Sequence, residues 1–528
     1  MKAGSISREK RYFRFICIHW RKRCTFLKRS ETVKNTSFSP VCDACANEMD
    51  RLTIAKDYDA LASYVLQQED EYASNNDFEC APIFFYIGTG NSTLAHHYHC
   101  SSSDNEQEIT YRKKALFYFR KAISLLESGD DNHVILLPIY TNYANDLDSC
   151  GRVIEALRIY RKALSITDSF GMATANYGRA LSFYANMVND PGHYQDLHCH
   201  AYQAIKRALK FKDANMHTEA VAVFEKQIED YEKCFNKEIL SRKITYPEYD
   251  LGTYDEEEYR NWCLRNHLFL NPLNDLMTPE SAFAHDPLTI TQYTEYVLRD
   301  DVGEKSNGNP PKWFAMLNQL KEEFIYARLL CYEGIEKRDQ PHFADRNVRL
   351  SLANYDYVNY SIRLEQLKSA FRISYSLFDQ IAFMINEFWK LGFGERQADA
   401  HHVFDCKHFP KDNVALTALF WAFNEFKEEY IEGVGASEKE LKTLRHALEH
   451  KFVQVHEYSK PDELRIKDDR FYHLSESSLK EHTLRILVLA REWIMELVYA
   501  IAIEESKNED KENAVHLHIA DYDDQWKL

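Results

Sequence analysis

Hydrophobic residues recur at three- and four-residue spacing along most of this chain, which is the pattern of amphipathic helices. The pattern is clearest past Pro311, in four long blocks near 312–336, 353–391, 412–456 with a break at 433–435, and 475–506. In the second block the apolar positions are Leu367, Phe371, Phe378, Ile381, Ile385 and Phe388. We therefore predict a helical bundle over residues 312–506.

A degenerate repeat precedes the bundle, over residues 45–244. Its clearest copy consists of Tyr140, Ala144, Leu147, Gly151, Ala156, Tyr160 and Ala163. This copy resembles the tetratricopeptide repeat, in which small residues let two antiparallel helices approach and aromatic residues fill the space between them. Gly88 and Gly178 occupy the small position in an earlier and a later copy. Such repeats stack into a solenoid that holds a peptide or a partner's helix; plain helical hairpins without a ligand are the alternative.

The segments between the repeats and the bundle, and after the bundle, lack the helical spacing of hydrophobic residues. Residues 245–311 contain Asn271, Pro272, Asn274, Pro279 and Pro287, which interrupt helices. We expect a partly packed connector there. Residues 507–528 form an acidic, polar tail.

Composition narrows the class of protein. With 16 glycines and 13 prolines in 528 residues, turns are few, which excludes a collagen-like chain and a many-turned β-sandwich. The formal charge of -17 opposes binding of nucleic acid by bulk charge, so contact with a polyanion must be local. The 12 cysteines are scattered, as expected of reduced thiols in the cytoplasm. The most apolar stretch, 484–503, contains four charged residues, so we predict neither a membrane span nor a membrane partner.

The N-terminal segment, residues 1–44, is a basic arm. Nine Lys and Arg residues lie between positions 8 and 29 and alternate with aromatic residues, a composition that suits a polyanion. A loosely ordered extension is the alternative. Cys17, Cys24 and Cys42 lie here and Cys45 follows directly, but only Cys42 and Cys45 have the close spacing of zinc ligands, and we predict no metal.

One helix of the bundle carries candidate chemistry. Ser437 and Glu440 form a capping box directly after the glycine break, and Leu441, Leu444 and Leu448 form the buried stripe of the helix that follows. The polar positions of that helix are Arg445, His446, Glu449 and His450. Histidine can move a proton near neutral pH, and arginine holds phosphate with two parallel donors.

An arginine, a polar residue directly after it and a histidine after four intervening positions resemble the motif of the HEPN superfamily (higher eukaryotes and prokaryotes nucleotide-binding). The order of repeats, connector and bundle also resembles a bacterial branch of that superfamily. The resemblance implies a metal-independent ribonuclease without a cofactor, in which the 2′-hydroxyl of the RNA attacks the phosphate. It assigns His450 as general acid or base, Arg445 as phosphate clamp, His446 as a further site residue and Glu449 as a secondary one. By resemblance, such nucleases serve as toxins or in anti-phage defence.

The same spacing of arginine and histidine occurs by chance elsewhere in the chain, so the structural context of each copy decides which one is the candidate site. Arg14 with His19 lies in the basic arm, and Arg396 with His401 or His402 follows two glycines in a predicted loop. Arg260, Asn261 and His267 precede the prolines of the connector and form the reserve candidate. Only Arg445 with His450 lies in a capped amphipathic helix of the bundle.

Arg445 and His450 are five residues apart, which places them about 140° apart around an ideal helix. The HEPN resemblance implies a two-fold dimer in which the arginine of one protomer meets the histidine of the other, and we expect such a homodimer.

Other interpretations remain. His446, Glu449 and His450 also give the order H-x-x-E-H of inverted zinc proteases, and Arg445 with Glu449 could be an ordinary surface pair. A non-enzymatic scaffold, in which the repeats bind a protein and the bundle dimerises or binds nucleotide, is the alternative function.

Overall fold

The computed structural model describes residues 40–72, 75, 78–101, 105–127, 133–290, 312–336, 342–351, 357–405, 412–426, 437–457 and 468–507. The basic arm up to residue 39, with Cys17, Cys24, Arg14 and His19, and the acidic tail from residue 508 lie outside these residues. The described chain is mostly helical, which confirms the predicted all-α class. Its described residues divide into two compact units.

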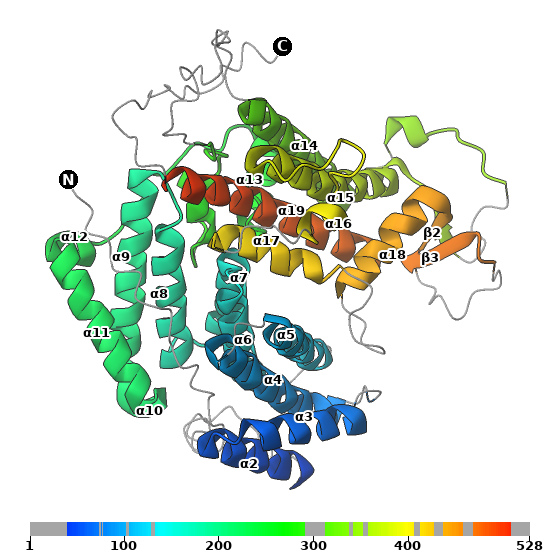
Figure 1. Cartoon of the computed structure of the whole chain (residues 1–528). Helices are drawn as coiled ribbons and strands as arrows, with labels where there is room; N and C mark the ends of the chain where they lie inside the picture. The colour runs from blue at the N-terminus through cyan, green and yellow to red at the C-terminus, as the bar shows by residue number, and fades with distance from the viewer. Residues whose placement is uncertain are drawn as a thin grey trace. The chain divides into compact units, whose positions relative to one another are not determined.

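The first unit takes the described parts of Met1–His267, Pro272–Ala284 and Phe420–His446. Consecutive helices pair as hairpins, α4 with α5, α6 with α7 and α8 with α9, and α5 packs on α6 and α7 on α8 (Figure 1). The helices up to residue 265 are α2 (Pro40–Ala55), α3 (Tyr58–Tyr72), α4 (Ala81–Ser101), α5 (Asn105–Glu127), α6 (His133–Ser149), α7 (Val153–Ile166), α8 (Gly171–Ala185), α9 (Pro191–Ala208), α10 (Lys212–Asn215), α11 (Thr218–Cys234), α12 (Lys237–Ser241) and α13 (Tyr254–Arg265).

The small residues of the repeat act as predicted. A Cβ atom on Gly88 would lie 2.9 Å from the ring of Phe119, and one on Gly178 would lie 2.7 Å from Ile205, so only glycine permits these helix approaches. Gly151, in the turn between α6 and α7, has a φ of 80°, which favours glycine.

Buried charges join elements of the first unit. Arg112 is paired with Asp146 at 2.7 Å, and both side chains are almost fully buried. Glu425, 2% exposed, forms ion pairs of 2.8 Å with both Arg120 and Arg152. Since an unpaired buried charge is costly, these pairs fix the segments that carry them.

The range predicted as a partly packed connector is exposed over most of residues 245–258, whereas most residues from 259 to 290 are buried or half-buried. The capping box of Thr253 and Glu256 starts α13, and Asn274 and Asp275 are buried beyond it. The hydroxyl of Tyr184 donates to Asp275 at 2.8 Å. Residues 291–311 lie outside the described part, and the predicted domain boundaries remain predictions.

The second unit takes the described parts of Leu268–Asn271, His285–Leu419 and Ala447–Leu528. Three long helices, α14, α15 and α19, pack against one another (Figure 1). Five positions of the predicted stripe are buried on α15, namely Leu367, Phe371, Phe378, Ile381 and Ile385, whereas Phe388 near the end of the helix is half-buried. The helices from residue 312 on are α14 (Lys312–Glu336), α15 (Ile362–Trp389), α16 (Ala400–Phe404), α17 (Val414–Asn424), α18 (Ser437–His450) and α19 (Glu476–Glu505).

The helical prediction for 412–456 is wrong at its end. Residues Phe452–His456 form strand β2, which pairs antiparallel with β1 (Val358–Asn359) and parallel with β3 (Phe471–Ser475). The alternation of Val453 and Val455 with Gln454 has the two-residue period of a strand, and the partners that stabilise it lie far away in the sequence.

Charged residues within the apolar stretch of α19 serve packing. Arg491 is 2% exposed and donates to the backbone oxygens of Phe269, at 2.7 Å, and Asn271, at 3.1 Å. Within the described residues, no helix is apolar enough over a sufficient length to cross a bilayer. The nine described cysteines are free thiols.

Candidate functional site

The helix that carries the candidate motif, α18, begins at Ser437, directly after the predicted break, and ends at His450, six residues before the predicted end. Its leucines are buried: Leu441 and Leu444 are 0% exposed and Leu448 is 6% exposed. The predicted capping box lies outside the described side chains, because that of Ser437 is not among them.

The other face of α18 is open to solvent. Arg445, His446, Glu449 and His450 are all exposed. On a helix with about 100° per residue, His446 and His450 lie about 40° apart and share a face, whereas Arg445 and His450 lie about 140° apart. The structure therefore brings the two histidines to one side of the helix. It does not bring Arg445 and His450 of one chain together.

The last turn of α18 is held by a residue of α15. The Arg372 guanidinium donates to the backbone oxygen of Leu448 at 2.8 Å, and its Nε lies 3.8 Å from Oε1 of Glu449. A cation at the carbonyl end of a helix satisfies an oxygen that lacks a helical partner and favourably meets the helix dipole. Arg372 thus fixes the backbone directly before His450.

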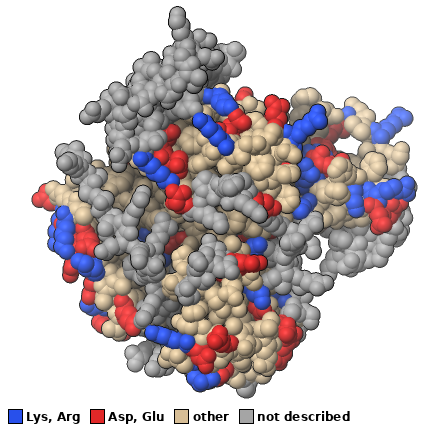
Figure 2. All heavy atoms as spheres, viewed as in Figure 1, with Lys and Arg blue, Asp and Glu red and all other residues tan. Residues whose placement is uncertain are grey.

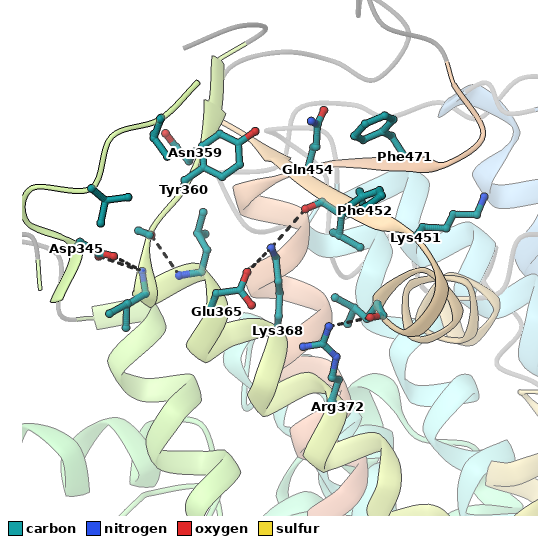
Figure 3. Close-up of a pocket in the computed structure, with 17 residues that line it drawn as sticks. Asp345, Asn359, Tyr360, Glu365, Lys368, Arg372, Lys451, Phe452, Gln454 and Phe471 are labelled. Carbon is teal, nitrogen blue, oxygen red and sulfur yellow. Dashed lines mark hydrogen bonds and ion pairs between the residues drawn. The ribbon is translucent and has the colours of Figure 1, made fainter. Parts of the chain in front are cut away.

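A cavity of about 590 Å³ opens beside this last turn (Figure 3). Its walls come from the segment before α15, from the first turns of α15, from β2 and β3, and from the end of α18. Leu448 and Lys451, which flank Glu449 and His450 in the sequence, both line it. The residues labelled in Figure 3 are Asp345, Asn359, Tyr360, Glu365, Lys368, Arg372, Lys451, Phe452, Gln454 and Phe471.

Most charged groups of the cavity hold the protein together. Asp345 accepts hydrogen bonds from the amide of Ile362 at 3.1 and 3.0 Å, at the start of α15. Lys368 is paired with Glu365 at 2.7 Å and reaches the backbone oxygen of Val453 at 3.4 Å. Outside the cavity lining, Arg363 of α15 contacts Glu476, the first residue of α19, at 2.9 Å. Burial acts to raise the pKa of Glu476, but hydrogen bonds from Arg363 and Lys480 outweigh it and lower that pKa to about 2.

The reserve candidates make structural contacts. The guanidinium of Arg260, on α13, donates to the backbone oxygen of Leu251 at 3.0 Å. His267 follows the end of α13 with a φ of 52°, and its Nδ1 hydrogen-bonds the backbone oxygen of Asn274. Asn261 lies half-buried on α13 between them.

The other motif copy in the second unit lies outside the long helices, as expected. Arg396 precedes the short helix α16, on which His401 and His402 are exposed. His402 is bound by Asp399, its Nδ1 at 2.8 Å from the carboxylate.

The zinc alternatives can be compared with the geometry. Cys42 and Cys45 lie buried on α2, and His446 and His450 lie on one face of α18. Among the described residues, no group of three or more His, Cys, Asp or Glu side chains gathers closely enough to hold a metal ion.

Sequence reasoning missed the cavity and the residues that shape it. Arg372 is 76 positions from its acceptor Leu448, and no local pattern links the two. The available signal was the alternation of Phe452, Val453, Gln454 and Val455, which marks a strand directly after α18.

Comparison with protein families matches residues 305–504 to the family described as LA2681-like HEPN. The chain carries a C-terminal HEPN domain, preceded by a helical region. Comparisons with curated proteins and with solved structures gave no match. The matched range contains α14, α15, α18 and the cavity, whereas Arg260, Asn261 and His267 lie outside it. A HEPN domain indicates an RNA-related function, because the superfamily includes ribonucleases.

Proposed function

We propose that this protein is a metal-independent RNA endonuclease of HEPN type. In this proposal it acts as a toxin or an anti-phage defence effector and is regulated through its helical repeats. The observation that carries the proposal is α18: within the HEPN domain, it buries its leucines and exposes Arg445, His446 and His450 together.

The chemistry needs one proton carrier and one fixed cation. The 2′-hydroxyl of the RNA attacks the adjacent phosphorus, the bond to the 5′-oxygen breaks, and a 2′,3′-cyclic phosphate remains. His450 takes or returns a proton in these steps, and Arg445 stabilises the charge on the phosphate oxygens. His446, on the same face as His450, lies near enough to contact the same strand.

The two assigned residues diverge on one helix, so the proposal includes a homodimer. A two-fold axis that brings two α18 helices together places Arg445 of one protomer beside the partner subunit's His450. The exposure of both residues on α18 is compatible with such a meeting.

RNA cleavage in EDTA tests the proposal, because the chain supplies a matched control. Wild-type protein should cleave and leave 2′,3′-cyclic ends, and His450→Ala should lose about 10²- to 10⁴-fold in rate. His401→Ala removes an exposed histidine that follows an arginine at the same spacing in the same domain, and should cleave like wild type. Equal losses in both variants, or no cleavage by wild type under any activating condition, would contradict the nuclease assignment.

The second candidate function is a scaffold, and one feature of the first unit favours it. A cavity of about 900 Å³ between α9 and the segments 241–246 and 276–283 is lined by four cations and a single acid. The cations are Lys206, Arg207, Lys210 and Lys243, and the acid is Glu280. In a chain with a net charge of -17, this concentration of positive charge suits an acidic peptide of a partner protein.

The same cavity also serves the nuclease proposal, because a partner protein that binds there through an acidic peptide is the proposed regulator of RNA cleavage. Exchange of Lys206 and Lys210 for glutamate should abolish capture of an acidic peptide and leave RNA cleavage by the unregulated protein unchanged. Peptide binding without RNA cleavage by wild type would favour the scaffold.

A further inference from the structure

Three side chains around the HEPN-domain cavity have no polar role inside the protein. Among the described residues, the hydroxyl of Tyr360, the ammonium of Lys451 and the amide of Gln454 take part in no hydrogen bond or ion pair, and all three residues contribute to the lining of the same cavity. Tyr360 is 57% exposed and the neighbouring Phe452 is 69% exposed. Large exposed aromatic side chains beside an unpaired cation and amide indicate a surface built for a ligand.

The geometry of strands β2 and β3 places several of these side chains on one face of the sheet. Phe452 and Gln454 lie two positions apart on β2, so both point to one face of the sheet. In the adjacent strand Phe471 lies opposite Phe452, with ring centres 5.7 Å apart, and His473 lies opposite Gln454. Phe471 and His473 are themselves stacked at 6.2 Å. This face of the sheet therefore carries three neighbouring aromatic rings, of Phe452, Phe471 and His473, beside the Gln454 amide.

We propose that this cavity is a subsite for one unpaired nucleotide of the RNA, next to the phosphate that is cleaved. The base stacks on Phe452 and against Tyr360, the Gln454 amide hydrogen-bonds the edge of the base, and Lys451 holds the neighbouring phosphate. Stacking on aromatic rings together with local cations is the usual way in which proteins hold single strands. This subsite deepens the proposed nuclease function and rests on it.

Two features favour a nucleotide over an apolar partner. A hydrophobic surface placed here would bury the Lys451 ammonium and the Gln454 amide without partners, which is costly, whereas a nucleotide satisfies both. The cavity volume of about 590 Å³ lies within the usual range for small-ligand sites.

The position of the cavity links it to the cleavage site. Lys451 directly follows His450, and consecutive Cα atoms are about 3.8 Å apart. A strand whose phosphate contacts His450 can thus place its next nucleotide over β2. The subsite then selects which base flanks the cut, since Gln454 offers both a donor and an acceptor.

Binding of RNA that cannot be cleaved tests the subsite directly. Fluorescein-labelled 2′-O-methyl oligonucleotides of A, C or U lack the attacking hydroxyl, so their anisotropy with the full-length protein reports binding alone. Phe452→Ala should weaken binding by about 5- to 100-fold. Gln454→Glu, which replaces an amide donor by an acceptor, should change the order of affinity for the three bases. Tyr249→Ala removes a side chain that is 60% exposed in the first unit, and should bind like wild type.

The outcomes separate this inference from the nuclease proposal. If wild type cleaves no RNA but oligonucleotide binding depends on Phe452, the nuclease proposal fails, and nucleotide binding in the cavity stands without a cleavage site beside it. If wild type cleaves RNA, and Phe452→Ala and Gln454→Glu retain its affinity and its choice of cleavage sites, the subsite is overturned. It is equally overturned if Phe452→Ala alters the oligomeric state and not the affinity for RNA. Because Phe452 and Gln454 are not buried, circular dichroism should show folded variants.

Discussion

Mixing two inactive variants should restore RNA cleavage if the site is shared between protomers. The variants are Arg445→Ala and His450→Ala, both at exposed positions of α18. Because α18 is an unbroken helix from Ser437 to His450, the two positions lie about 140° apart around its axis and about 7.5 Å apart along it. Side chains that diverge in this way cannot grip one phosphate from a single helix, so each variant alone should be inactive.

The size of the restored activity follows from the symmetry. When equal amounts of the two variants exchange subunits freely, half of the dimers are mixed. Each mixed dimer has one intact pair, the arginine of one protomer with the histidine of the other, out of two possible sites. The mixture should therefore show about a quarter of wild-type activity. Since each variant alone should lose at least about 100-fold, the mixture should exceed either one by about 25-fold or more.

The assay follows initial rates on a fluorogenic RNA in EDTA after co-expression or subunit exchange. Native mass spectrometry confirms that mixed dimers have formed. Mixed dimers without activity above that of the single variants would refute a site shared across the two-fold axis. A stable wild-type monomer that cleaves RNA would refute it as well.

Three further predictions concern residues of the first unit, and one of them has its control position, Gly394, in the second unit. Gly178→Ala places a Cβ 2.9 Å from a backbone oxygen. Overpacking of about 1 to 3 kcal/mol should exceed the gain of about 1 kcal/mol in helix propensity, so the thermal midpoint of unfolding should fall. The control Gly394→Ala, with no atom within 4 Å of the new Cβ, should not lower the midpoint. Burial lowers the pKa of His198 to about 4, below the ordinary value of about 6.5 in the unfolded chain. The free energy of unfolding should therefore fall as the pH drops below about 6.5, by about 2 kcal/mol at pH 5. In His198→Gln, thermal melts at pH 7 and pH 5 should differ less than in wild type. Glu425→Ala leaves two buried guanidinium groups without their shared partner and should cost about 3 to 5 kcal/mol in calorimetry; a loss below about 1 kcal/mol would contradict the ion-pair geometry.

Local patterns were enough to predict the helices and the exposed face of α18. Leu441, Leu444 and Leu448 repeat at helical spacing, and this spacing alone requires Arg445 and His450 to lie outside the buried stripe. Gly88 and Gly178, as small residues in the repeat, likewise indicated close contacts between helices. These features depend on neighbours within a turn or two, and the sequence displays such neighbours directly.

The strand after α18 was mistaken for helix because five residues give too short a window for the period to decide. Its pairing with β3 and β1 involves residues about 20 and about 100 positions away. The cavity beside His450 depends on the same pairing and on Arg372 of α15. The candidate roles of Arg445 and His450 remain predictions.

The sequence by itself determined the helical class, the repeat with its small residues, and the helix that presents an arginine and two histidines to solvent. Only the tertiary structure decided that a three-stranded sheet follows this helix, that Arg372 caps its last turn, and that Tyr360, Lys451, Phe452 and Gln454 surround one cavity. The physical reason is range: the periodicity of a helix is set by residues three and four positions apart, whereas a cavity forms where segments distant in the chain fail to fill the space between them.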